Sequence, residues 1–484
     1  MQHNRDGEQK SFNQFGLFSF LLLFFTFQLF AGSFENFKKI QNKTFHEYKD
    51  QKDNEFSKYL KEQWQEYQAY ITPSLYKKAK PKVIAPLREK KTLHIGPIVK
   101  IPLLDQNEPS IKPKPVIKAS KKDIVFDFFG TELGFTLDKT IMNAKFYPAN
   151  QSGVANFFSI LASSNYTILL DEIRSYKKAL QLNDWALYLL INKLSQQIYH
   201  DRNEANIYVW FLFNKLSYNV KLALNESKNT YLLFYSKSRV YSTPRYAFHG
   251  QYYYILSNFN KKEIQKIYTY THAYPDAKKS FDFALRKLPL FAEDIASKQV
   301  SFKEHAQKYE ITFQYNKEII SFMKTYPQVD YAIYFNVPIE SLIYKKILKE
   351  IKNYIDGKKM SDALNFVLHF VQKAFVYKRD QEQFGKEKVM FAEETLIYNA
   401  SDCEDRAVLF AYLVKHIFGI RVVGVKYSDH ISTALYIPMQ GDSVFINRRK
   451  YVLADPTYIN ANIGQEIPKY RDIQPETFIY VDSL

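Results

Sequence analysis

The sequence holds a single cysteine, Cys403, among its 484 residues, and it has few glycines and tryptophans. One cysteine excludes an intrachain disulfide and any zinc site built from several cysteines. No cysteine directly follows the apolar N-terminal segment, so a lipid-modified N-terminus of the lipoprotein type is not expected. This composition fits either a reducing compartment or an exported protein that does without disulfides.

The chain also lacks a dense block of lysine and arginine, although its formal net charge is +17. Its lysines are scattered between acidic and aromatic residues, whereas nucleic-acid binders concentrate basic side chains on one face. We therefore interpret the charge as a solvated basic surface and expect no nucleic-acid partner. Contact with an anionic envelope surface or an acidic substrate is the alternative.

An apolar run, FGLFSFLLLFFTFQLFA, covers residues 15–31. It has the length of the apolar region of a signal peptide and is short for a membrane span. Ala31, Gly32 and Ser33 supply the small residues of a cleavage site. We predict that residues 1–33 are an export signal, or else an uncleaved N-terminal membrane anchor. Both alternatives place the protein in the periplasm or cell envelope, the second on the inner membrane.

The remainder divides into four segments by composition. Residues 34–119 begin with aromatics at helical spacing over 34–72, which predicts amphipathic helix, and continue as a proline- and lysine-rich linker. Residues 120–260 predict an α+β domain, and residues 261–358 a helical or mixed bridging region. Residues 359–484 carry the chemistry-bearing motifs.

Within the bridging region, the pattern of residues 281–290 predicts helix. Residues 311–316 (ITFQYN) and 331–338 (YAIYFNVP) are compatible with strands as well as with helix. The segment between 381 and 398 is predicted to be a loop that leads into the next helix.

Residues 401–420, SDCEDRAVLFAYLVKHIFGI, predict a helix with a well-marked start and stop. Ser401 and Asp402 are residue types that cap helix N-termini, and Gly419 is typical of a helix end. Cys403 therefore falls in the first turn, where free backbone N–H groups and the helix dipole favour a thiolate.

Two strands predicted downstream carry a histidine and an aspartate. His430 opens the strand over residues 431–437, and Asp455 closes a strand that starts near Arg449. A cysteine nucleophile needs a base and a group that orients the base. We therefore expect Cys403, His430 and Asp455 to meet as a catalytic triad.

This order of residues resembles the transglutaminase-like superfamily, and the bacterial transglutaminase-core proteins most closely. The resemblance covers about residues 360–470 and is carried by EETL at 393–396, DCEDR at 402–406, His430 and ADPTY at 454–458. It implies an α+β fold of papain-like type, in which the helix that bears the cysteine packs on an antiparallel sheet.

The resemblance further implies that Cys403 attacks an amide or peptide carbonyl, with His430 as base and Asp455 as its orienter. The substrate is then a protein or peptide, and no cofactor or metal is expected. Water as second substrate gives hydrolysis, the favoured outcome, and an amine gives transamidation. Gln383 is the candidate side-chain donor to the oxyanion.

The acidic neighbours of Cys403 work against its ionisation. Asp402, Glu404 and Asp405 should raise the pKa of the thiol, unless Arg406 neutralises one of these carboxylates. The helix N-terminus and His430 have to offset this effect. The alternative to an enzyme is therefore a non-catalytic envelope scaffold or binding module that keeps the same fold.

A second copy of the fold is suggested over about residues 150–260. An offset of 200 residues lays Asn203-Glu204 on Cys403-Glu404 and brings similar helix-to-strand sequences side by side. No histidine or aspartate follows at matching positions, so we expect this copy to have no chemistry of its own.

Overall fold

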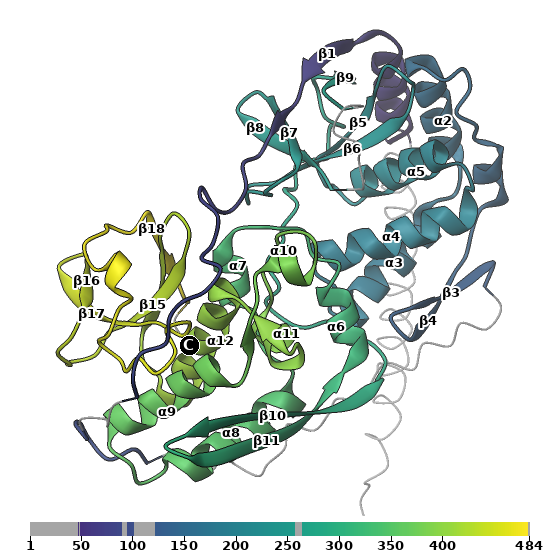
Figure 1. Cartoon of the computed structure of the whole chain (residues 1–484). Helices are drawn as coiled ribbons and strands as arrows, with labels where there is room; N and C mark the ends of the chain where they lie inside the picture. The colour runs from purple at the N-terminus through teal and green to yellow at the C-terminus, as the bar shows by residue number, and fades with distance from the viewer. Residues whose placement is uncertain (1–46, 48, 90–93, 101–121, 257–263, 483–484) are drawn as a thin grey trace, which may run out of the picture.

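The structure is a computed structural model that describes residues 47, 49–89, 94–100, 122–256 and 264–482. It is an α+β protein with two lobes, each built from helices packed against a curled antiparallel sheet (Figure 1). The predicted leader, residues 1–33, lies outside the described residues. Among the described residues no single helix has the length and apolarity to cross a membrane, and the pair α2 (Gln151–Ser163) and α3 (Thr167–Ala179) meets that test only together, with an 85° bend.

The first lobe has a helical layer whose members begin at polar caps. Asn150, Asn183 and Asp201 each accept a backbone N–H of the first turn of α2, α4 and α5. Helix α5 is buried on all sides between residues 205 and 214, which makes it the central helix of this lobe. The helices are α2 (Gln151–Ser163), α3 (Thr167–Ala179), α4 (Asp184–Ile198) and α5 (Arg202–Lys215), preceded by the hairpin β3 (Ile124–Phe128) and β4 (Thr131–Phe135) and the 3-10 helix η1 (Lys139–Asn143).

Seven strands form the sheet of the first lobe, in the order β1-β9-β5-β6-β8-β7-β2. Its central strands are rich in aromatic and aliphatic residues that pack on α4 and α5. The strands are β1 (Trp64–Gln68), β2 (Tyr70–Ile71), β5 (Val220–Leu224), β6 (Thr230–Tyr235), β7 (Pro244–Phe248), β8 (Gln251–Ile255) and β9 (Lys266–Tyr270).

Two of these strands correct the helical prediction for residues 34–72. The described part of that range is helical at residue 47 and over residues 49–62 and then becomes β1 and β2. Strand β1 pairs with β9, and β2 pairs with β7, both antiparallel. Pairing with strands some 200 residues away in sequence outweighs the local helical pattern, because a free sheet edge supplies hydrogen bonds to any nearby chain.

The bridging region contains more strand than predicted. A hairpin of two ten-residue strands, β10 (Ile295–Glu304) and β11 (Gln307–Asn316), confirms the strand alternative for residues 311–316. The strand alternative for residues 331–338 is wrong, because α7 occupies Tyr331–Phe335, and the helix predicted over residues 281–290 is absent. The remaining helices here are α6 (Lys317–Met323) and α8 (Ser341–Ile355).

The second lobe packs α12 against a five-stranded sheet of order β16-β17-β15-β14-β18. The segment predicted as loop between 381 and 398 contains two short helices, α10 and α11, and so that prediction is wrong in part. The elements are α9 (Met360–Lys373), β12 (Val376–Tyr377), α10 (Asp380–Gln383), α11 (Ala392–Ile397), β13 (Ala400–Ser401), α12 (Cys403–Phe418), β14 (Val422–Lys426), β15 (Ile431–Leu435), β16 (Ser443–Ile446), β17 (Arg449–Ala454), η2 (Pro468–Tyr470) and β18 (Thr477–Tyr480).

The two sheets share a strand order. In the first lobe the strands that follow α5 are arranged β9-β5-β6-β8-β7, and in the second lobe the strands that follow α12 are arranged β18-β14-β15-β17-β16. When the five strands of each sheet are numbered by their order in the chain, their spatial order in both sheets is fifth, first, second, fourth, third. All strand pairs in both sheets are antiparallel. Each sheet is thus preceded by one helix and wound in the same way.

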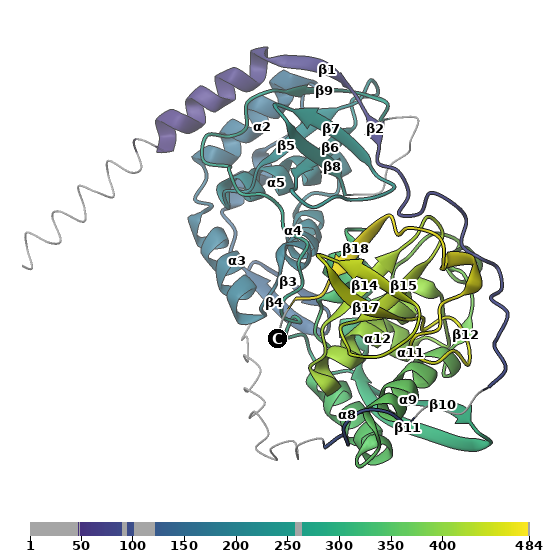
Figure 2. The same cartoon turned by 90° about the vertical axis from the view of Figure 1, so that its left-hand side faces the viewer.

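Residues 72–89 join the first lobe to the second and have no regular secondary structure, as the linker prediction requires. These residues are nevertheless in contact with the second lobe. Figure 2 shows this segment leaving β2 and running along the second lobe, and we call it the strap.

Two glycines in separate loops beside the second sheet lie in close contact, and this contact leads to a first prediction. Gly441 has φ +137°, and a Cβ placed on it would lie 2.4 Å from the Cα of Gly464. We expect Gly441→Ala to destabilise the protein by about 3 kcal/mol or more, because backbone strain adds to a backbone clash. Gly385→Ala is the matched control: it also has positive φ, but nothing lies within 4 Å, so about 1 kcal/mol is expected. Equal losses in chemical denaturation would contradict this explanation.

Candidate functional site

Cys403 is the first residue of α12, as predicted, and its side chain is fully buried. Asp402 is the N-cap of this helix, and its backbone N–H donates to Oδ2 of Asp405 at 3.2 Å. It ends at Gly419, which adopts a left-handed conformation with φ 64°. Local capping thus fixes the cysteine at the start of the helix.

The thiol faces two oxygens that the sequence did not assign to it. Sγ of Cys403 donates to Oε2 of Glu404 at 3.2 Å, and the hydroxyl of Tyr76 lies 3.6 Å from the same sulfur. Burial, followed by the charges of Glu404 and Asp402, raises the pKa of Cys403 well above its ordinary value. In this conformation burial and the carboxylates outweigh the helix N-terminus, and the thiol is protonated.

His430 and Asp455 meet as predicted. Nε2 of His430 lies 2.7 Å from Oδ2 of Asp455, and both side chains are fully buried. The register of β15 and β17, with Thr433 opposite Ala454, brings the start of one strand beside the end of the other. Burial alone would raise the pKa of Asp455, but the charge and hydrogen bond of His430 and the N–H of Thr457 hold it below its ordinary value.

The other nitrogen of His430 is buried and unused. Nδ1 has no hydrogen-bond partner among the residues that the structure describes. The ring of Tyr470 stacks on the imidazole, with centroids 4.9 Å apart and planes 13° from parallel. With Nε2–H donated to Asp455, Nδ1 is left as the basic nitrogen. Among the described residues Sγ of Cys403 makes its hydrogen-bond contacts with Glu404 and Tyr76 and none with His430.

A lysine from the strap sits beside the thiol, surrounded by carboxylates. Nζ of Lys80 lies 2.9 Å from Oδ2 of Asp380, 2.5 Å from Oδ2 of Asp402 and 2.8 Å from Oε1 of Glu404. Burial would lower the pKa of Lys80, but these carboxylates together raise it. In return, the charge of Lys80 overcomes burial and lowers the pKa of Glu404 to about 2.

One ammonium does not neutralise all the buried carboxylates here, which gives a prediction about pH. Burial, then the charges of Glu404 and Asp405, raise the pKa of Asp380 to about 8. The folded state therefore holds a proton that the unfolded state loses near pH 4, and stability falls as the pH rises from there towards 8. The slope is at most about 1.4 kcal/mol per pH unit.

Asp380→Asn removes this titration, while its amide oxygen can still accept the N–H of Lys388, now 3.0 Å from Oδ2 of Asp380. We expect the stability of the wild type relative to this variant to decline between pH 5 and pH 8, measured by urea denaturation at each pH. A difference that stays constant with pH would mean that Asp380 is ionised throughout.

Two further residues of the site behave differently from their predicted roles. Arg406 neutralises no carboxylate by direct contact: its guanidinium donates to Oγ of Ser401 and to the carbonyls of Gln372 and Phe375. The fully buried guanidinium satisfies its N–H groups on backbone carbonyls and a hydroxyl, and the charges of Asp402 and Asp405 act on it without a direct hydrogen bond. Nε2 of Gln383 donates to the carbonyl of Ala400 at 3.3 Å, two residues before the cap of α12.

Glu466 is a buried neighbour of the pair that the sequence did not reveal. Its carboxylate, that of Asp455 and a ring nitrogen of His430 lie within 4.8 Å of one another, a spacing that could hold a metal ion. Burial and the charge of Asp455 raise the pKa of Glu466 well above its ordinary value. With Glu466 protonated and Asp455 ionised, the two carboxyl groups together present a single negative charge to the imidazole of His430. No pattern around residue 466 distinguishes it from a loop glutamate.

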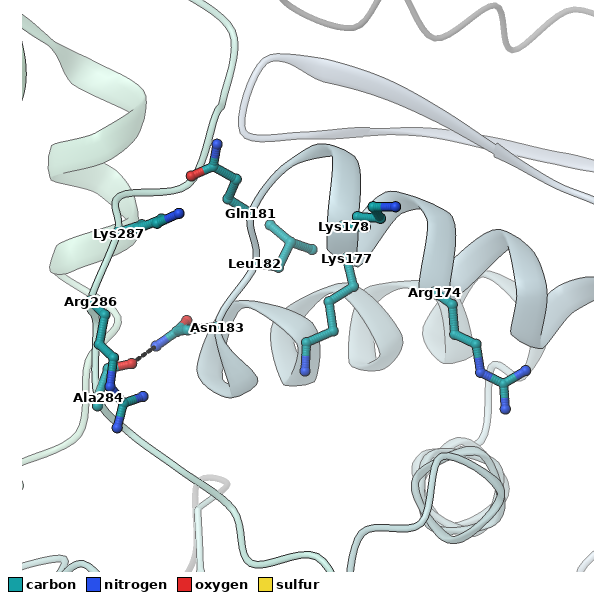
Figure 3. Close-up of a pocket in the computed structure, with 9 residues that line it drawn as sticks. All are labelled: Arg174, Lys177, Lys178, Gln181, Leu182, Asn183, Ala284, Arg286 and Lys287. Atoms are coloured by element: carbon teal, nitrogen blue, oxygen red, sulfur yellow. Dashed lines mark hydrogen bonds between the residues drawn. The ribbon is translucent and has the colours of Figure 1, made fainter.

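A separate hollow lies in the first lobe, away from these residues (Figure 3). It has a volume of about 480 Å³ and lies between the end of α3, the start of α4 and residues 284–287. Its lining includes five basic side chains, namely Arg174, Lys177, Lys178, Arg286 and Lys287. Arg174, Lys177 and Arg286 already pair with aspartates. The drawn side chains point in different directions, so we do not assign the site here.

Models of known protein families, curated proteins and solved structures were compared with this chain, and none of them matches it. The resemblance of residues 360–470 to the transglutaminase-like superfamily therefore rests on the motifs and geometry of this chain alone.

Proposed function

We propose that the protein is an exported, cysteine-dependent amide or peptide hydrolase or acyltransferase of transglutaminase-like type. In this proposal Cys403 is the nucleophile, His430 the base and Asp455 the group that orients the base. The observation that carries it is the buried His430–Asp455 pair, whose second ring nitrogen has no hydrogen-bond partner among the described residues.

A purely structural histidine does not need this arrangement. Leaving a buried polar atom without a hydrogen bond costs about 1–3 kcal/mol, so buried ring nitrogens are normally satisfied. An aspartate that fixes the tautomer, together with a free and basic Nδ1, is what proton abstraction from a thiol requires. The unused nitrogen therefore supports a catalytic role for His430 in this proposal.

The chemistry follows from these roles. When Sγ of Cys403 turns from Glu404 to His430, its proton passes to Nδ1 and the thiolate attacks a carbonyl carbon. The C–N bond then breaks, the leaving amine takes the proton from the imidazolium, and a thioester remains on Cys403. Water or a second amine, deprotonated by His430, releases the acyl group. The first-turn N–H groups of α12 lack helical partners and can donate to the oxyanion, with Gln383 as the candidate second donor.

Acylation by p-nitrophenyl acetate tests the proposal. We expect one acetyl group per chain, located on the peptide that contains Cys403 by mass spectrometry, and none there in Cys403→Ala. If the acetyl groups fall only on lysines, or are unchanged in Cys403→Ala, the assignment of the nucleophile fails.

The second candidate function is a non-catalytic scaffold or binding module, and the burial of the thiol favours it. Cys403 has no exposed surface, and the hydroxyl of Tyr76 lies against its sulfur. A permanently closed site would leave the protein with a fold and no reaction. In that case Cys403 reacts with thiol reagents only after global unfolding.

We also infer that the two lobes derive from a duplicated domain whose first copy has no chemistry. The shared strand order supports this, and so do matching turns: the N–H of Tyr427 donates to the carbonyl of His430, and the N–H of Asn225 to that of Asn229. Asn229 thus stands where the second copy has its histidine. In the first copy, Oδ1 of Asn203 accepts the N–H of Thr230 and is not a nucleophile.

A further inference from the structure

The strap follows a defined path across the second lobe (Figure 1). The N–H groups of Lys77 and Lys78 both donate to the carbonyl of Ser428, in the turn that leads to His430. Further along, the hydroxyl of Tyr377 donates to the carbonyl of Pro81, and the N–H of Leu87 to that of Ile459. The strap is thus an extended chain held by backbone hydrogen bonds, as a peptide bound in a groove would be.

The strap passes over the thiol and the acidic cluster. The hydroxyl of Tyr76, besides touching the sulfur, donates to Oε2 of Glu404 at 2.8 Å. Four residues later Lys80 places its ammonium among Asp380, Asp402 and Glu404. These contacts join residues 300 or more positions apart in the sequence.

Only selected strap side chains are buried. Leu75, Tyr76 and Lys80 are buried, and the last two contact residues of the second lobe, whereas residues 77–79 between them are exposed. Of the lysines at 77, 78, 80 and 82, only Lys80 is inserted. The pocket that receives it also contains a buried Oδ1 of Asp402 with no hydrogen-bond partner in the described part of the chain.

We propose that the strap is an autoinhibitory segment that fills the substrate groove beside Cys403, and that the open groove binds an extended peptide carrying a lysine side chain in the acidic pocket that Lys80 occupies. This inference rests on the proposed function for its enzymatic meaning, and on the strap contacts for its geometry. The chain's own segment shows the class of ligand: an extended backbone, with an aromatic residue over the thiol and a lysine four residues later.

Opening the strap follows directly from this proposal. The thiol has no exposed surface while Tyr76 and Lys80 are in place, so a substrate reaches it only when the strap lifts. The exposed stretches on either side of Lys80, and the three prolines at 73, 81 and 86, keep the strap out of any sheet. It therefore leaves the groove without breaking a strand pairing.

Alkylation of Cys403 by iodoacetamide in the folded full-length protein, followed by peptide mass spectrometry, measures access to the thiol. We expect Tyr76→Ala to be labelled at least about tenfold faster than the wild type, and Tyr76→Ala/Lys80→Met faster again, because local opening becomes more populated. Tyr76→Ala keeps Lys80 among the carboxylates and is the variant chosen to stay folded. The matched control, Lys78→Ala/Lys82→Ala, changes two exposed lysines of the same strap and should label like the wild type.

A synthetic peptide of residues 72–88 separates strap release from general loosening. Added to Tyr76→Ala, it should slow labelling towards the wild-type rate, and the same peptide with Lys80→Met should need about tenfold more to do so. Equal labelling of the wild type and Tyr76→Ala, or no protection by the peptide, overturns the proposal. Equal protection by both peptides overturns the lysine pocket. Fast labelling that the peptide reverses, without any acylation of Cys403, supports the strap and rejects the proposed enzyme.

Discussion

His430→Gln is expected to lower the rate of Cys403 acylation by about 10²–10⁴-fold, the usual contribution of a positioned general base. Glutamine is neutral and can still donate a hydrogen bond to Asp455, which lies 2.7 Å from Nε2 of His430, so the fold should persist. What it lacks is the basic nitrogen that Nδ1 supplies. The measurement is the burst of p-nitrophenol in the Tyr76→Ala background, where the thiol is accessible.

His249→Gln is the matched control, because His249 is exposed in the turn between β7 and β8 of the first lobe. The acylation rate of the His249→Gln variant should equal that of the Tyr76→Ala parent. The rate of Asp455→Asn should lie between those of His430→Gln and His249→Gln, since it keeps the imidazole but weakens control of the imidazole tautomer. If all three variants acylated at the same rate, the reactivity of Cys403 would owe nothing to His430.

Lys80→Met is expected to destabilise the protein by about 3–5 kcal/mol, the usual loss when one partner of a buried ion pair is removed. Methionine fills much of the volume of the lysine stem but removes the ammonium that lies among Asp380, Asp402 and Glu404. Urea denaturation at pH 7 measures the change. Lys82→Met, at an exposed position of the strap, should stay within about 0.5 kcal/mol of the wild type.

A double-mutant cycle with Glu404→Gln sharpens this result. Lys80 lowers the pKa of Glu404 to about 2, so Glu404 loses a charge in that variant, and the further loss caused by Lys80→Met should be smaller than in the wild type. Strictly additive losses would show that Lys80 contributes through packing of its stem rather than through the carboxylates.

The sequence was sufficient where local patterns determine the structure. The caps and apolar spacing of residues 401–420 predicted α12, and the patterns of the following segments predicted β15 and β17. The contact between His430 and Asp455 followed from the ends of two adjacent strands. These elements depend on near neighbours in the chain, which the sequence displays.

The rest of the site depends on contacts between distant segments. Tyr76 and Lys80 lie in a stretch that reads as a proline-rich linker, and nothing in it indicates that one lysine of four is buried against α12. The same limit explains β1, whose aromatic pattern suits a helix until β9 offers a sheet edge. The sequence predicted that acidic neighbours would raise the pKa of Cys403, but not that Glu404 would accept a hydrogen bond from its thiol.

The most direct test of the central claim is the pH dependence of Cys403 alkylation by iodoacetamide in Tyr76→Ala, compared with Tyr76→Ala/His430→Gln. We predict that the parent reaches its plateau rate near neutral pH, because the imidazole takes the thiol proton, and that the glutamine variant reacts appreciably only at alkaline pH. Identical profiles that rise together into the alkaline range would contradict the account, since the thiol would then ionise without His430.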